Sequence, residues 1–238
     1  MEGKRLSEHS SYEDYASKHV NYYQGINNTL LGMVPSNVKQ VLDIGCAEGN
    51  LGAAIKAETG AYVAGVELFS SAAEIAVTKL DQVIVENIEE VDPADLALTR
   101  KQFDAIMFGD VLEHLINPAN VLKKLKPLLS NNGCVLASIP NVGHISIIES
   151  LLAGLWTYTD AGLLDKTHYR FFTRNEIVKL FESSGYIVEN LMIIPYSNSR
   201  YDQMIEALEA VNQKFQINSE HFKTEASAYQ YVIKAKPL

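Results

Sequence analysis

Short runs of β-branched and other apolar residues alternate along this chain with segments of helical periodicity, and this alternation limits the folds open to it. Such a pattern is typical of a mostly parallel sheet whose strands are joined by helices. The runs predict strands at Gln40–Ile44, Tyr62–Glu67, Gln82–Glu86, Phe103–Phe108, Gly133–Ile139, Tyr186–Ile194 and Ala228–Lys236. The first five are apolar on both faces, which indicates strands covered by helices on each side. We therefore expect a doubly wound, seven-stranded α/β fold whose last two strands form an antiparallel hairpin at one edge.

Helix start and stop signals lie between these runs. They are capping boxes at Ser71/Glu74 and Thr173/Glu176, a proline after a capping residue at Asp92-Pro93 and Asn117-Pro118, and a terminating glycine at Gly185. Each signal predicts a helix boundary, and together they place helices over Ala72–Lys79, after Asp92, after Asn117 and between Thr173 and Gly185.

Two regions depart from simple alternation. Residues 1–35, with the Tyr-rich stretch Tyr12–Met33, predict an N-terminal helical segment ahead of a main domain over residues 36–238. Residues 140–172 separate the fifth strand from its helix, where a connection of ~2–6 residues is usual. An insertion of this length at the carboxyl end of a strand is expected to form a cap over a substrate site.

Composition excludes several classes of protein. The 238 residues are 47% hydrophobic and 21% charged, as in a folded globular protein, and the formal net charge of −9 disfavours nucleic acid as a partner. No run reaches the ~18 apolar residues of a membrane span. The polar N-terminus lacks a secretory pattern, which predicts a cytoplasmic location without stable membrane insertion. Cys46 and Cys134 are too few for a disulfide scaffold and match no zinc spacing.

The strongest chemical signal is the run Val41-Leu-Asp-Ile-Gly45-Cys-Ala-Glu-Gly49, in which a buried strand leads through a glycine loop into a helix. Backbone N–H groups and the positive end of the helix dipole then face the strand tip. Glu67 follows the next strand, 22 residues after Gly45, where a carboxylate can accept both hydroxyls of an adenosine ribose. The loop therefore predicts an adenosyl ligand, although Asp43 could instead cap its own loop and Glu67 could be a solvated strand end.

Two nucleotide classes use this architecture. A dinucleotide fingerprint would require glycines at 45, 47 and 50, but Ala47 and Asn50 occupy the last two positions. Glu48 would also repel a pyrophosphate. A sulfonium and an amino group are compatible with Asp43 and Glu48, so the charges favour S-adenosylmethionine over NAD.

From about residue 36 onwards the chain resembles class I S-adenosylmethionine-dependent methyltransferases of the small-molecule type, including those of ubiquinone biosynthesis and of polysaccharide pathways. The resemblance implies a Rossmann-like methyltransferase fold. It implies cofactor contacts from Asp43, Gly45, Cys46, Ala47, Gly49, Glu67, Leu68, Asn87, Ile88, Asp110 and Leu112. In this set Ala47 replaces the family's middle glycine and Asn87 replaces an acid near the adenine, while Asp110 is expected near the methionine end.

The sequence Asp110-x-x-Glu113-His114 follows the fourth strand, and in some relatives Glu113 and His114 could bind a divalent metal. Adjacent residues on a helix point ~100° apart, however, and the spacing shows no third ligand. We therefore expect Glu113 and His114 to pair structurally and no metal to be bound.

Methyl transfer to a hydroxyl needs alignment for in-line attack and a base with a pKa near neutrality. His144 and His168 are the candidates for this base, and Asp165 could orient His168 or bind a substrate hydroxyl. Each histidine could equally be a packing residue.

Trp156 and Tyr158 are candidates for a face that stacks on the substrate, and Arg170 for a group that holds a carboxylate or phosphate. The expected function is O-methylation of a small molecule, a sugar or glycan precursor. The alternatives are a quinone-type or other aromatic acceptor, or a non-catalytic regulator that binds S-adenosylmethionine. The chain could also assemble as a homodimer.

Overall fold

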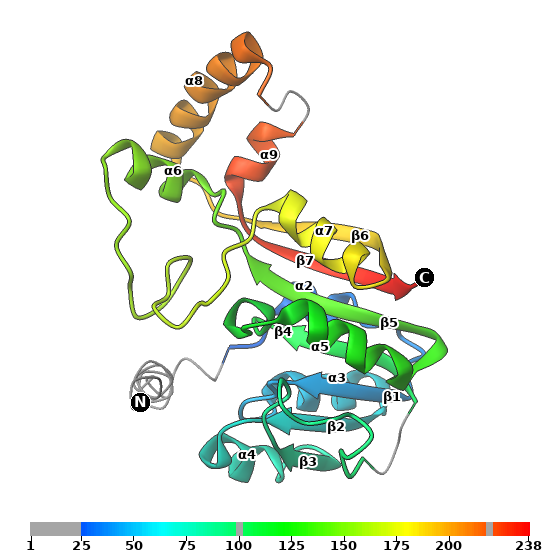
Figure 1. Ribbon diagram of the computed structural model, residues 1–238. Helices are drawn as coiled ribbons and strands as arrows, with labels where there is room; N and C mark the ends of the chain where they lie inside the picture. The colour runs from blue at the N-terminus through cyan, green and yellow to red at the C-terminus, as the bar shows by residue number, and fades with distance from the viewer. Residues whose placement is uncertain (1–24, 99–101, 218–220) are drawn as a thin grey trace, which may run out of the picture.

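The computed structural model describes residues 25–98, 102–217 and 221–238, and its centre is a seven-stranded sheet in the order β3-β2-β1-β4-β5-β7-β6 (Figure 1). The strands are β1 (Gln40–Ile44), β2 (Tyr62–Glu67), β3 (Gln82–Val85), β4 (Phe103–Gly109), β5 (Leu129–Pro140), β6 (Tyr186–Pro195) and β7 (Ala228–Pro237). β7 pairs antiparallel with both β5 and β6, whereas the pairs among β1 to β5 are parallel. The predicted doubly wound sheet with an antiparallel edge hairpin is confirmed.

Helices cover both faces of this sheet. The helices are α2 (Asn28–Gly32), α3 (Asn50–Thr59), α4 (Ser70–Ala76), α5 (Pro118–Leu125), α6 (Ile145–Leu152), α7 (Arg174–Ser183), α8 (Ser199–Phe215) and α9 (Phe222–Ser227). One apolar cluster packs α5 and α7 against the sheet through Val121 and Phe181, and a second packs α2 and α3 on the other side through Leu30 and Ile55. Burial on both faces explains why the parallel strands are apolar throughout.

The predicted helix boundaries are only partly correct. The Asn117 side chain caps α5 by accepting from the Asn120 N–H at 3.1 Å, and Gly185 adopts a φ of 84° just after α7, as expected. Thr173 occupies the N-cap of α7 without a side-chain cap bond. Ser71 lies inside α4, which begins at Ser70. Asp92-Pro93 opens a single turn and no helix.

The segments at the carboxyl ends of the strands form a separate layer (Figure 1). The insertion at residues 140–172 contains α6 and a long loop, and it returns to the sheet at the Asn141–Phe172 bridge. α8 and α9, which the sequence analysis did not identify as helices, connect β6 to β7, and Ile205 of α8 packs on Ile145 of α6.

The predicted N-terminal helical segment lies mostly outside the described residues, which include only α2 from it. Within the described ranges, we find no helix with the length and apolar character needed to cross a bilayer.

Candidate active site

A cavity of about 1090 Å³ opens at the carboxyl ends of β1, β2 and β4. This edge includes the point between β1 and β4 where the strand order reverses, the usual ligand site of a doubly wound sheet. Its wall is formed by the glycine loop, the ends of these strands, α2, residues 162–169 of the insertion, and Tyr229 and Gln230 of β7.

The glycine loop has a conformation that larger residues would not tolerate. Gly45 has a φ of 66°, and a Cβ built there would lie 2.6 Å from Val111 Cγ2. Gly49, with a φ of 76°, forms the N-cap of α3. Ala47 has a φ of 49° at the position where the family carries glycine, so its backbone is strained. Gly45, Cys46 and Ala47 line the cavity.

Glu67 connects the glycine loop to the end of β2. Its Oε2 accepts from the Ala47 N–H at 2.8 Å and its Oε1 from the Phe69 N–H at 2.9 Å. Burial raises the pKa of this carboxyl, and the backbone hydrogen bonds partly offset that rise. Each carboxylate oxygen can accept more than one hydrogen bond, so these contacts leave capacity for a ribose.

Asp43 lies beneath the loop and is only 2% exposed. Within the described residues its Oδ2 has no hydrogen-bond partner. Burial, with the nearby Glu67 charge as a second cause, raises the pKa of Asp43 to about 7. A buried carboxylate oxygen without a partner on a cavity wall suits a ligand ammonium. The glycine cradle and Asp43 together therefore fit S-adenosylmethionine.

The residues expected at the adenine have different surroundings. Leu68 and Asn87 line the cavity, but the Asn87 side chain also organises its own turn, since its Oδ1 accepts from the Glu89 N–H at 3.0 Å. Ile88 is largely buried at the wall. The Leu112 side chain, in contrast, is fully buried in the core, and Val111 lies on the wall at this point.

Asp110 follows β4 and has a φ of 56°, a strained conformation for a residue with a side chain. The Gln230 amide donates to its Oδ1, and its backbone N–H donates to Ser138 Oγ at 3.0 Å. Burial raises the pKa of Asp110 to about 6. The site therefore places a second perturbed carboxyl group on the wall, beside the glycine loop.

The expectation that His144 could act as a base is wrong on geometric grounds. The side chain is fully buried, lies outside the cavity wall and caps α6. Its Nε2 lies 2.8 Å from the Tyr196 carbonyl oxygen, to which it must donate, and its Nδ1 accepts from the Ser146 N–H at 3.2 Å. Burial lowers the pKa of His144, which keeps the ring neutral for this capping role.

His168 lines the cavity as expected, next to a second imidazole, His114, whose ring centre is 4.7 Å away. Asp165 Oδ1 accepts from Thr167 Oγ1 at 2.7 Å and from the Thr167 N–H at 2.9 Å. Thr167 O and Oγ1 lie 3.1 and 3.3 Å from His114 Nδ1. Asp165 is therefore linked through Thr167 to His114, whereas the sequence predicted that it orients His168 or binds a substrate hydroxyl.

This chain of contacts determines the His114 tautomer. A carbonyl oxygen can only accept, and the Thr167 hydroxyl donates its hydrogen to Asp165. His114 Nδ1 must therefore carry a hydrogen, and Nε2 is the nitrogen that can take a proton or bind a metal. No sequence pattern marks His114 as a base, because Thr167 is 53 residues away in the chain.

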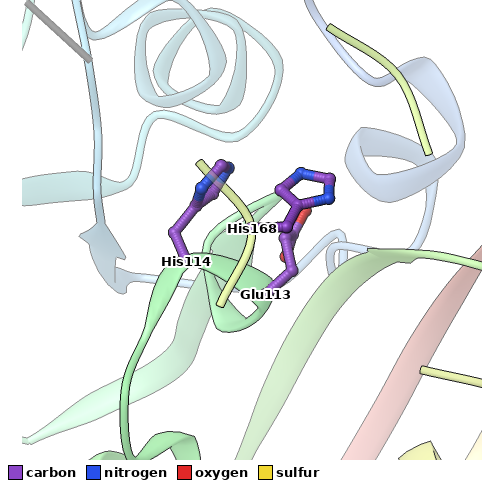
Figure 2. A group of neighbouring side chains, drawn as sticks. All are labelled: Glu113, His114 and His168. Carbon is purple, nitrogen blue, oxygen red and sulfur yellow. The ribbon is translucent and has the colours of Figure 1, made fainter. Parts of the chain in front are cut away.

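Figure 2 shows the neighbouring side chains of Glu113, His114 and His168. One potential ligand atom from each lies within 4.8 Å of the others. The expectation that no third ligand exists is therefore wrong, since the insertion supplies His168. Imidazole and carboxylate ligands suit divalent transition metals, and three protein ligands leave coordination positions open.

The three residues expected to bind substrate lie outside the cavity wall. Trp156 and Tyr158 are exposed and pack against Phe171, with ring centres 5.5 and 6.2 Å away. Arg170 Nε donates to the Ile116 carbonyl at 3.1 Å. Tyr169, Tyr229 and Gln230 line the wall instead; no motif marks them, because their positions depend on the insertion path and on the placement of β7.

The fold and this cavity define a class I S-adenosylmethionine-dependent methyltransferase. A family model for the methyltransferase domain matches residues 25–191. The chain therefore belongs to this methyltransferase-domain family.

The similar proteins agree with this assignment. A ubiquinone biosynthesis O-methyltransferase of Aeromonas salmonicida is 25% identical over 161 residues, which is 67% of each chain. One from Coxiella burnetii is 30% identical over 151 residues, covering 62% of this chain and 63% of the relative.

Solved structures show the same fold. A putative methyltransferase of Bacillus halodurans has a TM-score of 0.57 at 16% identity, covering 89% of this chain and 98% of its own. The Burkholderia thailandensis 1,6-didemethyltoxoflavin-N1-methyltransferase, solved with bound 1,6-didemethyltoxoflavin and S-adenosylhomocysteine, has a TM-score of 0.58 at 16% identity, covering 96% of this chain and 84% of its own.

Proposed function

We propose that this methyltransferase transfers its methyl group to a hydroxyl oxygen of a small molecule. The observation that carries this proposal is the pair of imidazoles, His114 and His168, on the wall of the cavity that contains the glycine loop. A hydroxyl must lose its proton on methylation, and imidazole is the side chain best matched to accept it near neutral pH.

The residues have separate roles in binding S-adenosylmethionine. The Gly45–Ala47 backbone holds the amino-acid end, Asp43 takes the ammonium group, and Glu67 takes the ribose hydroxyls. Leu68, Asn87 and Ile88 border the adenine. When bound, S-adenosylmethionine supplies an electrophilic methyl group, so the protein mainly has to orient the acceptor.

His114 Nε2 is the proposed proton acceptor, because Thr167 and Asp165 hold the hydrogen on Nδ1. His168 and Asp110, which both line the cavity, orient the acceptor hydroxyl. If a divalent metal is bound, Glu113, His114 and His168 would hold it, and it would favour the ionised hydroxyl.

A phenolic, quinone-type hydroxyl is the acceptor class best supported. The relatives named above are ubiquinone biosynthesis O-methyltransferases. The sugar or glycan precursor remains the second class. Trp156, Tyr158 and Arg170, the candidates for substrate contacts, lie outside the cavity wall, so the support for a sugar is the resemblance to polysaccharide-pathway enzymes.

The test measures S-adenosylhomocysteine release with a catechol and with a methyl glucoside as acceptors. We expect turnover of at least one, with a loss of about 100-fold in kcat for His114→Asn and little change for the surface control His221→Asn. Binding of S-adenosylmethionine with no transfer to either hydroxyl would contradict O-methylation and favour the regulator alternative.

A further inference from the structure

The cavity wall carries many more acids than bases. Its carboxylates are Asp43, Glu67, Glu86, Glu89, Glu90, Asp110, Glu113 and Asp165. Within residues 25–98, 102–217 and 221–238, no lysine or arginine lines it. The wall therefore presents a concentrated negative field to any ligand that enters, beyond the formal charge of −9 of the whole chain.

Three of these carboxylates, Glu67, Glu89 and Asp110, accept hydrogen bonds from neutral donors. Glu89 accepts from the Ile116 and Asn117 N–H groups at 3.0 and 2.7 Å, as Glu67 does from the N–H groups of the glycine loop and Phe69. Asp110 accepts from the neutral Gln230 amide. Neutral donors stabilise a carboxylate without cancelling its field.

Basic side chains approach the wall from outside. Lys79 Nζ donates to Asn50 Oδ1 at 2.7 Å, and the Arg170 guanidinium donates to the Ile116 carbonyl, so both of these acceptors are neutral. Lys124 interacts electrostatically with Glu89, although its Nζ donates to the Val91 carbonyl at 2.7 Å. None of these three side chains lines the cavity. The site therefore differs from phosphate and carboxylate sites, in which arginine or lysine usually contacts the anion directly.

Asp43 gives an independent indication of the preferred ligand charge. Its Oδ2 is buried on the wall without a partner in the described part of the chain. Burial raises the pKa of both Asp43 and Asp110, and the Glu67 charge adds to this rise at Asp43. S-Adenosylmethionine, with two positive groups and one carboxylate, is compatible with this field.

We infer that the acceptor is an uncharged or cationic molecule and that anionic acceptors, such as nucleotide-diphosphate sugars and aromatic carboxylates, are excluded. This inference rests on the proposed methylation of a hydroxyl in the same cavity. It limits the sugar class to unphosphorylated, uncharged or amino sugars, and the phenolic class to rings without a carboxylate.

The test uses three catechols with the same ring and a two-carbon side chain that ends in an alcohol, an amine or a carboxylate. A parallel series uses methyl glucoside, glucosamine and glucuronate. Binding to the full chain saturated with S-adenosylhomocysteine is measured by calorimetry, and methylation separately by product release. We expect the carboxylate in at least one series to bind at least about tenfold more weakly than its uncharged counterpart. The difference should shrink between 0.05 and 0.5 M salt because screening weakens the repulsion.

The two measurements separate the two proposals. Equal or tighter binding of both carboxylates would overturn the charge inference, whether or not any ring is methylated. Weaker binding of the carboxylate than of its uncharged counterpart, without methylation of any compound, would support the charge inference and contradict the proposed O-methylation. Binding of none of the six compounds would count against both.

Discussion

Replacing Asp43 with asparagine should stabilise the ligand-free protein while weakening its binding of S-adenosylmethionine. The pKa of this buried carboxyl is raised from 3.8 to about 7, which corresponds to about 4 kcal/mol of unfavourable ionisation in the folded state. The folded protein keeps the proton that the unfolded chain has lost, so the Asp43 contribution to stability falls as pH rises from about 4 to about 7. Asparagine removes this penalty.

An asparagine amide needs partners of its own, so we expect a gain of about 1–2 kcal/mol at pH 8. That gain raises the melting temperature by about 2–8 °C in a chain of this size. Loss of the charge opposite the ligand ammonium should cost about 2–3 kcal/mol, or about 30- to 150-fold in Kd.

Differential scanning calorimetry and titration calorimetry measure the two effects, with Asp160→Asn, 92% exposed at its side chain, as a control for net charge. In the wild type, affinity for S-adenosylmethionine should rise as pH increases through about 7, and the variant should lose this dependence. A variant that melts lower than the wild type and binds S-adenosylmethionine with unchanged affinity would refute this account of Asp43.

Three further changes test other parts of the structure. Gly45→Ala should destabilise the protein by about 1–3 kcal/mol in urea titrations and abolish the thermal shift with S-adenosylmethionine, because its Cβ would meet Val111; a normal thermal shift would contradict the role of the loop. Below about pH 6.5 the wild type should lose stability, because burial lowers the folded-state pKa of His144 and the unfolded chain therefore takes up a proton that the folded protein does not. His144→Asn should flatten this slope between pH 7.5 and 5.5. Zn²⁺ or Mn²⁺ should raise the melting temperature in a chelator-reversible way, and an equal rise in His168→Ala would show that the metal binds elsewhere.

The sequence was sufficient for those parts of the structure that depend on local pattern. Strand runs and the Gly45–Gly49 loop were located correctly because apolar periodicity and glycine placement act over a few residues. The Asp92-Pro93 signal was wrong, because a favourable cap cannot form a helix without an apolar face to bury behind it.

Residues of the site could be predicted from the sequence only where they lie at or just after the end of a strand. His144 follows β5 closely, yet its side chain caps α6 and contacts the Tyr196 carbonyl oxygen just after β6. His114 became a candidate base only through Thr167, whose approach depends on the path of the insertion. Such contacts between distant segments leave no periodicity in a single sequence.

The placement of β7 between β5 and β6 has a consequence for biosynthesis. A nascent chain that has emerged as far as β6 has no neighbour with which to pair that strand, and it still lacks Tyr229 and Gln230. The cavity wall is therefore complete only late in translation, and β6 needs protection from adventitious pairing until then.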